Sequence, residues 1–341
     1  MAEEKKGQKI NWYRSPVNRE ILANLNQRSD WRGFVQALGH LGVLGFTSAC
    51  AWYAAEHLPF IVLLLILFVH GTINAFLLNA FHELCHRTVF KTKALNLIFL
   101  NLVSFLSWNN PVYFWASHQE HHKFTLHPPD DLEVVLPVKL TLVDFMKNAV
   151  ANPWDFITRL KSYIRLSIGR LEGPWENALF PVTEVDQRRS LFNWARLHLA
   201  GHALLAIVSL YFGLWLIPVL VTLAPFYGGW LLFLCNSTQH IGLQDKVPDF
   251  RLCCRTIYLN PVVRFFYWNM NYHTEHHMYA AVPCYNLGKL HAQIKSDLPP
   301  CPKGLYETWK GIIAILKIQQ VSPEYQYIAP LPGNKSPGKS S

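Results

Sequence analysis

Hydrophobic residues of this chain collect in four long stretches, which polar and basic segments separate. A helix of about 20 apolar residues crosses the hydrocarbon core of a bilayer. The stretches therefore predict four membrane-spanning helices, at residues 34–54, 59–80, 194–213 and 215–235. Only a few residues join the first helix to the second and the third to the fourth, so we expect two helical hairpins. A fifth apolar segment, residues 94–107, is only about 14 residues long and favours an interfacial or re-entrant helix.

Lysine and arginine residues set the expected orientation. They are concentrated before the first hairpin and between the two hairpins, and none lies in the two short connections. Because positive charge collects on the cytosolic side of membranes, we expect both termini and the central segment to be cytosolic. The membrane is then a bacterial inner membrane or the endoplasmic reticulum. The predicted fold is an all-α integral membrane protein, with four transmembrane helices in two hairpins and a helical cytosolic cap.

The same pattern divides the chain into three parts. We expect a cytosolic N-terminal segment at residues 1–31, a membrane domain at 32–300 and a cytosolic C-terminal tail at 301–341, loose beyond residue 321 where Pro, Gly, Ser and Lys are frequent. Hydrophobic residues make up 51% of the chain and charged residues only 16%, whereas soluble domains carry roughly a quarter charged residues. The net charge of +9 suits cytosolic loops beside anionic lipid head groups, and we expect no nucleic-acid partner.

Three histidine clusters are the candidate chemistry, and they hold eight of the sixteen histidines: His82 and His86; His118, His121 and His122; His273, His276 and His277. Residues at i, i+3 and i+4 share one face of a helix, so the imidazoles of each cluster should converge. Neutral imidazole is a common ligand for iron, copper and zinc. Eight ligands exceed the three or four that one ion needs, which favours two metal ions. All three clusters fall on the predicted cytosolic side.

The alternative reading of each cluster is an ordinary group of polar residues on a helix. A single His-x-x-x-His pair is weak evidence for metal, but three clusters, two of them with identical spacing, favour a shared site. The seven cysteines are dispersed without a Cys-x-x-Cys pair, so a zinc ribbon or iron–sulfur site is not expected. Cys85 lies between His82 and His86 and should point off their face, as a packed thiol.

The order and spacing of the clusters, together with their position after each hairpin, resemble the membrane fatty acid desaturase and hydroxylase superfamily. The resemblance covers roughly residues 31–300, and the third cluster, within residues 271–277, is similar to that of lipid desaturases, including sphingolipid desaturases. It implies two iron ions, cycling between Fe2+ and Fe3+, that activate dioxygen and abstract hydrogen from an unactivated C–H bond. It also implies a ninth ligand, since members often carry Asn-x-x-x-His after the fourth span. Here that element is Asn236 to His240, in which His240 is a ligand and Asn236 is a candidate that acts through a water molecule.

Acidic residues beside the clusters are candidates to hold the imidazoles in place. A metal-bound histidine usually donates its second N–H to a carboxylate or carbonyl group. Glu83, Glu120 and Glu275 are the principal candidates, with Asp130 and Asp131 beside them. The alternative for each is a solvated helix face.

The expected reaction is the oxygen-dependent desaturation of a fatty acyl chain or acyl lipid at the cytosolic membrane face. No Gly-x-Gly-x-x-Gly fingerprint or His-Pro-Gly-Gly haem signature is present, so electrons must come from an external ferredoxin, or from a small cytochrome b with its reductase. One alternative keeps the centre but makes the protein a lipid or carotenoid hydroxylase or ketolase. The other is a non-catalytic metal-binding or transport protein, which would place polar ligands within the spans.

Overall fold

The computed structural model describes residues 9–136 and 140–332. Within these ranges the regular structure is entirely helical, and strand pairing is limited to isolated bridges. The all-α prediction is therefore confirmed for the part of the chain that is described. Residues 1–8 of the predicted N-terminal segment and 333–341 of the predicted loose tail lie outside it.

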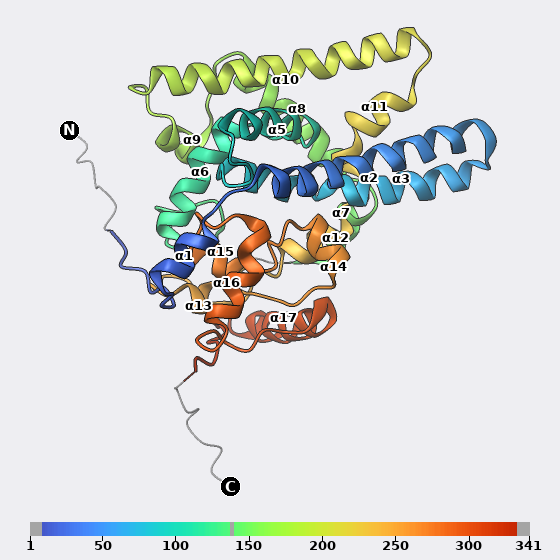
Figure 1. Cartoon of the computed structure of the whole chain (residues 1–341). Coiled ribbons are helices and arrows are strands. Elements are labelled where there is room, and N and C mark those ends of the chain that lie inside the picture. Colours follow the sequence, from blue (N-terminus) through green and yellow to red (C-terminus); the bar gives the residue numbers. More distant parts are fainter. Residues whose placement is uncertain (1–8, 137–139, 333–341) are drawn as a thin grey trace.

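The first two long helices run side by side and project away from the other elements (Figure 1). Helix α2 (Asp30–His57) begins at Ser29, whose hydroxyl caps the amide of Arg32, and α3 (Phe60–Ala75) begins directly after Pro59. A bend at Phe76 separates α3 from α4 (Leu77–Cys85), and the two together form an apolar helix of 26 residues. Both helices are long and apolar enough to cross a membrane.

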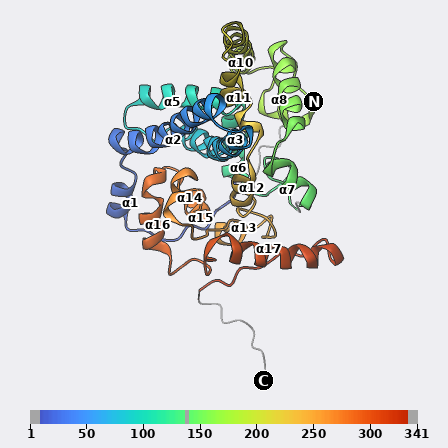
Figure 2. The ribbon, with the colours of Figure 1, turned by 90° about the vertical axis from the view of Figure 1, so that its right-hand side faces the viewer.

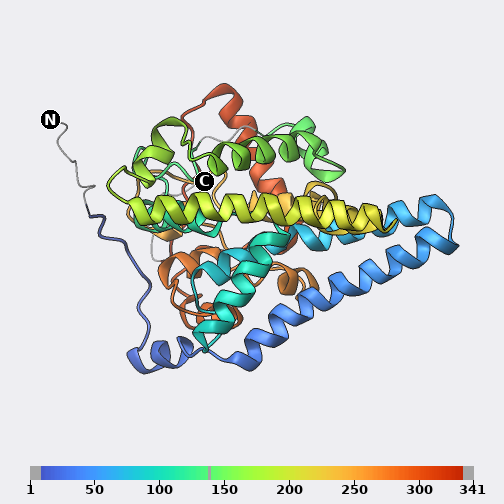
Figure 3. The same cartoon turned by 90° about the horizontal axis from the view of Figure 1, so that it is seen from above.

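A third long helix matches the third apolar stretch. Helix α10 (Val185–Tyr211) has the length and mean hydropathy of a membrane span, and it begins before the predicted boundary. Figure 3 shows α2, α3 and α10 reaching toward the same edge of the molecule. The fifth apolar segment forms α5 (Lys93–Leu106), a helix of 14 residues as predicted.

The fourth apolar stretch differs from the prediction because it is not one continuous helix. It consists of α11 (Leu216–Val221), the 3-10 turn η1 (Ala224–Phe226) and α12 (Trp230–Asn236). Pro225 cannot donate a backbone hydrogen bond, and Gly228 has a φ of +68°. The hydropathy of the segment does not reveal the helix breaks at these two residues.

The interrupted segment lets two stretches of backbone touch. A Cβ atom added at Gly228 would lie 2.6 Å from the carbonyl oxygen of Phe68 on α3, and one added at Gly71 would lie 2.3 Å from Tyr227. Only glycine permits this approach, which brings α12 and the residues after it against the end of α3.

The remaining helices surround the inner ends of these long elements. The N-terminal and central helices are α1 (Arg19–Leu25), α6 (Pro111–Phe124), α7 (Leu142–Ala149), α8 (Pro153–Ser167) and α9 (Gly173–Leu179). The C-terminal ones are α13 (Phe250–Cys253), α14 (Pro261–Phe266), α15 (His273–Met278), η2 (Cys284–Asn286), α16 (Leu287–Ile294) and α17 (Gly304–Val321). Figure 2 shows the C-terminal helices gathered below α2 and α3, with α8 and α10 above them. Helix α17 lies inside the predicted C-terminal tail.

Candidate metal centre

The three histidine clusters meet in one buried region where α4, α6 and α15 come together. Five imidazoles form the first group of candidate ligands, with one ring nitrogen from each lying within 4.8 Å of the others. These are His82, His86, His118, His122 and His276. Nε2 of His118 lies 3.1 Å from Nε2 of His86 and 3.0 Å from that of His122. Nε2 of His276 lies 3.2 Å from that of His122.

A second group forms beside the first. His240, His273 and His277 converge together with the thiol of Cys254. Nε2 of His273 lies 2.9 Å from Nε2 of His240 and 3.2 Å from that of His277. The imidazole rings of His122 and His277 stack with their centroids 4.5 Å apart, so the two groups are direct neighbours.

The remaining predicted ligand, His121, lies on the side of the second group. Its ring centroid is 4.9 Å from that of His277 and 5.3 Å from that of His240. Successive residues of α6 therefore serve different groups, because His118 and His122 share one helix face while His121 is turned toward α15. All nine predicted histidines come together in one region.

These imidazoles are suited to bind metal because they are held neutral. Burial, followed by the charge of neighbouring imidazoles, places the pKa of His118, His122, His273, His276 and His277 well below the ordinary value of 6.5. Burial likewise lowers the pKa of His240 to about 3. A metal ion requires the unprotonated ring, so little proton competition is expected at neutral pH.

The hydrogen bonds made by the Nδ1 atoms also support the conclusion that these imidazoles are suited to bind metal. Nδ1 of His118 donates to Glu133 at 2.8 Å, and Nδ1 of His240 donates to the carbonyl of Cys253 at 2.8 Å. Tautomers assigned from these bonds leave the Nε2 atoms as bare lone pairs that point at one another. Lone pairs converging in a buried region repel unless a cation lies between them. The donor set therefore fits metal ions, and its predominance of imidazoles suits iron, copper or zinc.

Comparison with protein families identifies the chain. The model of the fatty acid desaturase family matches residues 57–309, which include all three histidine clusters and His240. The chain belongs to the fatty acid desaturase family. A search of curated proteins found no match. Members of this family are membrane oxidoreductases of lipid metabolism that depend on iron, so this desaturase family member is an enzyme of that type.

Two of the carboxylates that were expected near the predicted ligands do contact them. Glu83 is buried, and its Oε1 lies 3.1 Å from Nδ1 of His82 and 3.6 Å from Nδ1 of His276. Asp131 accepts from Nδ1 of His121 at 2.8 Å. Burial opposes ionisation of Asp131, but its bond to His121 and two backbone amides outweigh that effect and lower its pKa.

The other predicted carboxylates lie elsewhere. Glu120 forms an ion pair with Lys123 at 2.6 Å on the outer face of α6, because it is two residues from His118 and so points away from it. Asp130 is exposed. Glu275 is buried but accepts hydrogen bonds from Thr256 and His291, so it ties α15 to α16 instead of holding a ligand.

Sequence reasoning missed two groups. Glu133, which holds His118 and also accepts from the hydroxyl of Ser117 at 2.9 Å, lies in the loop after α6. Its signal was the acidic run at residues 130–133. The thiol of Cys254 lies in the second group, while Cys85 is buried and belongs to neither group, as expected of a packed thiol. Asn236 accepts a 3.5 Å hydrogen bond from Asn79, which lies one turn before His82.

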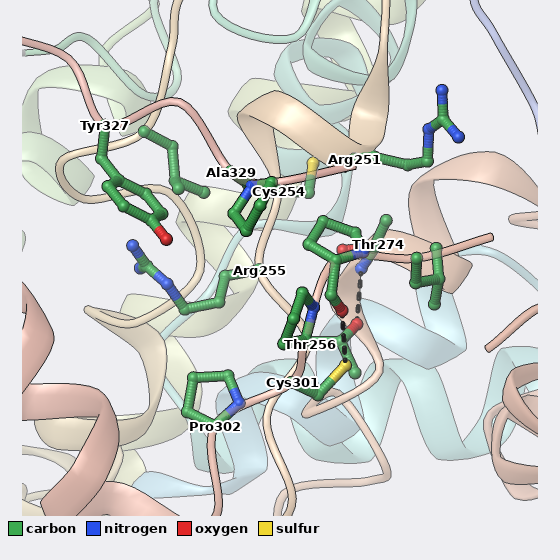
Figure 4. Close-up of a pocket in the computed structure, with 14 residues that line it drawn as sticks. Arg251, Cys254, Arg255, Thr256, Thr274, Cys301, Pro302, Tyr327 and Ala329 are labelled. Atoms are coloured by element: carbon green, nitrogen blue, oxygen red, sulfur yellow. Dashed lines mark hydrogen bonds between the residues drawn. The ribbon is translucent and has the colours of Figure 1, made fainter. Parts of the chain in front are cut away.

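A small cavity of about 220 Å³ lies behind the second group (Figure 4). Cys254 and Thr274 border it on the side of the metal centre, and the amide of Thr274 donates to the hydroxyl of Thr256 at 3.3 Å. Arg255 lines the far side, where its guanidinium donates to the carbonyls of Thr238 and Ile241. Tyr327 and Ala329, which follow α17, also line the cavity.

Proposed function

We propose that this enzyme uses two iron ions and dioxygen to desaturate a fatty acyl chain or acyl lipid at the cytosolic face of the membrane. The observation that supports this most directly is the pair of adjacent groups of neutral, converging imidazoles in a chain of the fatty acid desaturase family. An iron pair bound there would supply the oxygen activation needed to break an unactivated C–H bond.

Each ion has its own proposed ligands. The first ion would be held by His82, His86, His118, His122 and His276. The second would be held by His121, His240, His273 and His277, with Asn236 acting through a water molecule. Glu83, Asp131 and Glu133 would fix the ring orientation and tautomer of the ligands that they contact.

The proposed membrane arrangement has four crossings in two hairpins. Helices α2 and α3–α4 form the first hairpin, and α10 with the interrupted segment α11–η1–α12 forms the second. Broken helices are tolerated at membrane depth where other protein elements cover the free backbone groups. In this arrangement the termini and the metal centre are cytosolic, so a lipid chain in the bilayer can reach the centre from between the helices.

Electrons would come from a separate protein. We propose a ferredoxin, or a small cytochrome b with its reductase, that docks on the basic cytosolic surface. Turnover with such a donor should slow as salt is added, because ionic strength screens the steering charges.

The proposal is tested by metal content together with lipid analysis. The purified wild-type protein should hold two iron ions per chain, and lipids from expressing cells should lose two hydrogen atoms. His277→Ala should lower iron content toward one ion per chain and abolish the product, because it removes a ligand of the second ion. His57→Ala serves as the control, since its side chain is 54% exposed at the end of α2.

The lipid product separates the possible reactions. Gain of one oxygen atom in place of hydrogen loss would make the enzyme a hydroxylase. Bound iron with no product in the presence of oxygen and reductant would overturn the proposed activity altogether.

A further inference from the structure

A second cavity of about 250 Å³ borders α12 and shares no lining residue with the one in Figure 4. It is bordered by α3, α4, α7, α8, η1 and α12, and α7 packs directly against α12 (Figure 2). Its lining is unusually rich in amides, with five asparagines: Asn74, Asn109, Asn148, Asn152 and Asn236. Several of these amides already bond to neighbouring groups, as Asn152 does at the start of α8 and Asn148 does within α7. The amide that these bonds leave unexplained is that of Asn74.

Residues that line this cavity lie close in the sequence to two proposed metal ligands, His82 and His240. Asn74 and Leu78 lie eight and four residues before His82, on either side of the bend at Phe76. Asn236 lies four residues before His240. Eight residues of helix span about 12 Å, so a molecule in the cavity would lie within a few helical turns of the centre.

The cavity lining is electrically neutral. Among the described residues that line it, the charged side chains are Asp155 and Arg159, and Nε of Arg159 lies 3.0 Å from Oδ2 of Asp155. A second guanidinium nitrogen of Arg159 donates to the carbonyl of Trp108. A phosphate or carboxylate group would need a cation that is free to pair with it, and this arginine is already paired.

One hydrogen-bonding group in the cavity has no partner within the described chain. Asn74 is only 3% exposed, and its Oδ1 makes no hydrogen bond to any described residue. Leaving a buried carbonyl oxygen unpaired costs about 1–3 kcal/mol. Because Asn74 also lines the cavity, we take its unpaired oxygen as the acceptor for a hydroxyl or amide N–H donor that binds there.

We propose that this cavity binds the head group of the lipid substrate, and that the head group is uncharged and carries hydroxyl or amide donors. This inference rests on the proposed function, because it concerns the substrate of the same centre. The volume is below the 300–1,000 Å³ typical of sites that enclose a whole drug-sized ligand, so it suits a head group whose acyl chain continues outside. Phosphate-bearing lipids are disfavoured by the paired state of Arg159.

Binding measurements on the full-length iron-loaded enzyme in nanodiscs test the inference. The probes are an oleoyl monoacylglycerol and the matching lysophosphatidate, which share the chain and glycerol and differ by the phosphate. The wild type should bind the monoacylglycerol more tightly. Asn74→Leu, which keeps the shape but removes the acceptor, should weaken monoacylglycerol binding about tenfold and leave lysophosphatidate binding unchanged.

A second variant tests the charge argument without touching Asn74. Asp155→Asn frees Arg159 from its partner, so lysophosphatidate should bind severalfold more tightly while the monoacylglycerol changes little. Asn177→Leu on α9 is the control, because Asn177 is exposed and bonds only to its own helix.

Two results would overturn the inference. One is a wild type that prefers lysophosphatidate. The other is an Asn74→Leu protein with normal iron content and unchanged monoacylglycerol affinity, which would mean that the cavity holds only water. Binding needs neither oxygen nor reductant, so head-group selectivity without any desaturated product would count against the proposed function alone.

Discussion

At the scale of single residues, the metal centre depends on contacts between imidazoles and groups distant in the sequence. Glu133 lies fifteen residues after His118, yet its carboxylate accepts a hydrogen bond from Nδ1 of that ring at 2.8 Å. Fixing that proton leaves Nε2 of His118 unprotonated and directed at His86 and His122. The orientation of one candidate ligand is thus fixed by a loop that contains no candidate ligand itself.

Replacing Glu133 should therefore weaken metal binding without removing a ligand. We expect Glu133→Gln to lower the affinity for ferrous iron about 10- to 100-fold, the usual cost of losing such a carboxylate. The measurement is iron retained against a graded series of chelator concentrations.

Glu120→Gln is the matched control for that experiment. Glu120 was a candidate for the same role, but it pairs with Lys123 on the outer face of α6. Its substitution should leave iron retention at the wild-type level. Equal losses in both variants would show that the contact between Glu133 and His118 has no special part in holding metal.

At the scale of the element, close backbone contact decides where the fourth apolar segment lies. Gly71→Ala should destabilise the protein by about 1–3 kcal/mol, because its Cβ would meet the backbone and ring of Tyr227 at 2.3 Å. Gly42→Ala in α2 is the control, since a Cβ there meets nothing within 4 Å. That control should be neutral or slightly stabilising, because alanine favours helix.

The midpoint of thermal unfolding in detergent measures both glycine variants. A lower midpoint for Gly71→Ala but not for Gly42→Ala is expected. If Gly71→Ala unfolds at the wild-type temperature, α3 and the segment at 227–228 must be able to separate, and the contact does not position α12.

The helices also show which features of the structure the sequence pattern could predict. Long apolar runs predicted α2, α3 and α10, and helical spacing predicted which histidines converge, because both depend on local periodicity. The interruption at residues 222–229 was missed because hydropathy does not distinguish a continuous helix from one broken at Pro225 and Gly228. Glu133 and Cys254 were missed because a loop and a short turn bring them to the site. Such irregular segments have no sequence periodicity from which the position of a side chain could be predicted.

At the scale of the whole molecule, we expect the candidate metal centre to make folding stability depend on metal binding and on pH. Five imidazoles from the two helices α6 and α15 are buried together with pKa values well below 6.5, the cause being burial first and then mutual repulsion. His121 is the exception. Burial lowers its pKa, but the hydrogen bond and charge of Asp131 outweigh burial and raise it. The five imidazoles outweigh His121 in the pH dependence of folding stability because they are more numerous.

The metal-free protein should therefore lose stability in acid. Below about pH 6.5 these five histidines bind protons in the unfolded chain but remain unprotonated in the folded protein. The free energy of unfolding therefore falls as pH falls. Each imidazole contributes up to about 1.4 kcal/mol per pH unit in this window and nothing above it. His121 works in the opposite sense, since its raised pKa favours the folded state at low pH and that contribution is lost as pH rises.

Thermal unfolding of metal-free and iron-loaded protein between about pH 7.5 and about pH 5.5 checks this linkage. The metal-free midpoint should drop steadily below about pH 6.5, while the iron-loaded midpoint should hold until acid releases the metal, because a bound ion occupies the nitrogens that protons would take. A metal-free midpoint that is flat across this range would mean that the imidazoles accept protons while the fold persists. In that case the centre is open to water, and burial does not keep these ligands ready for metal.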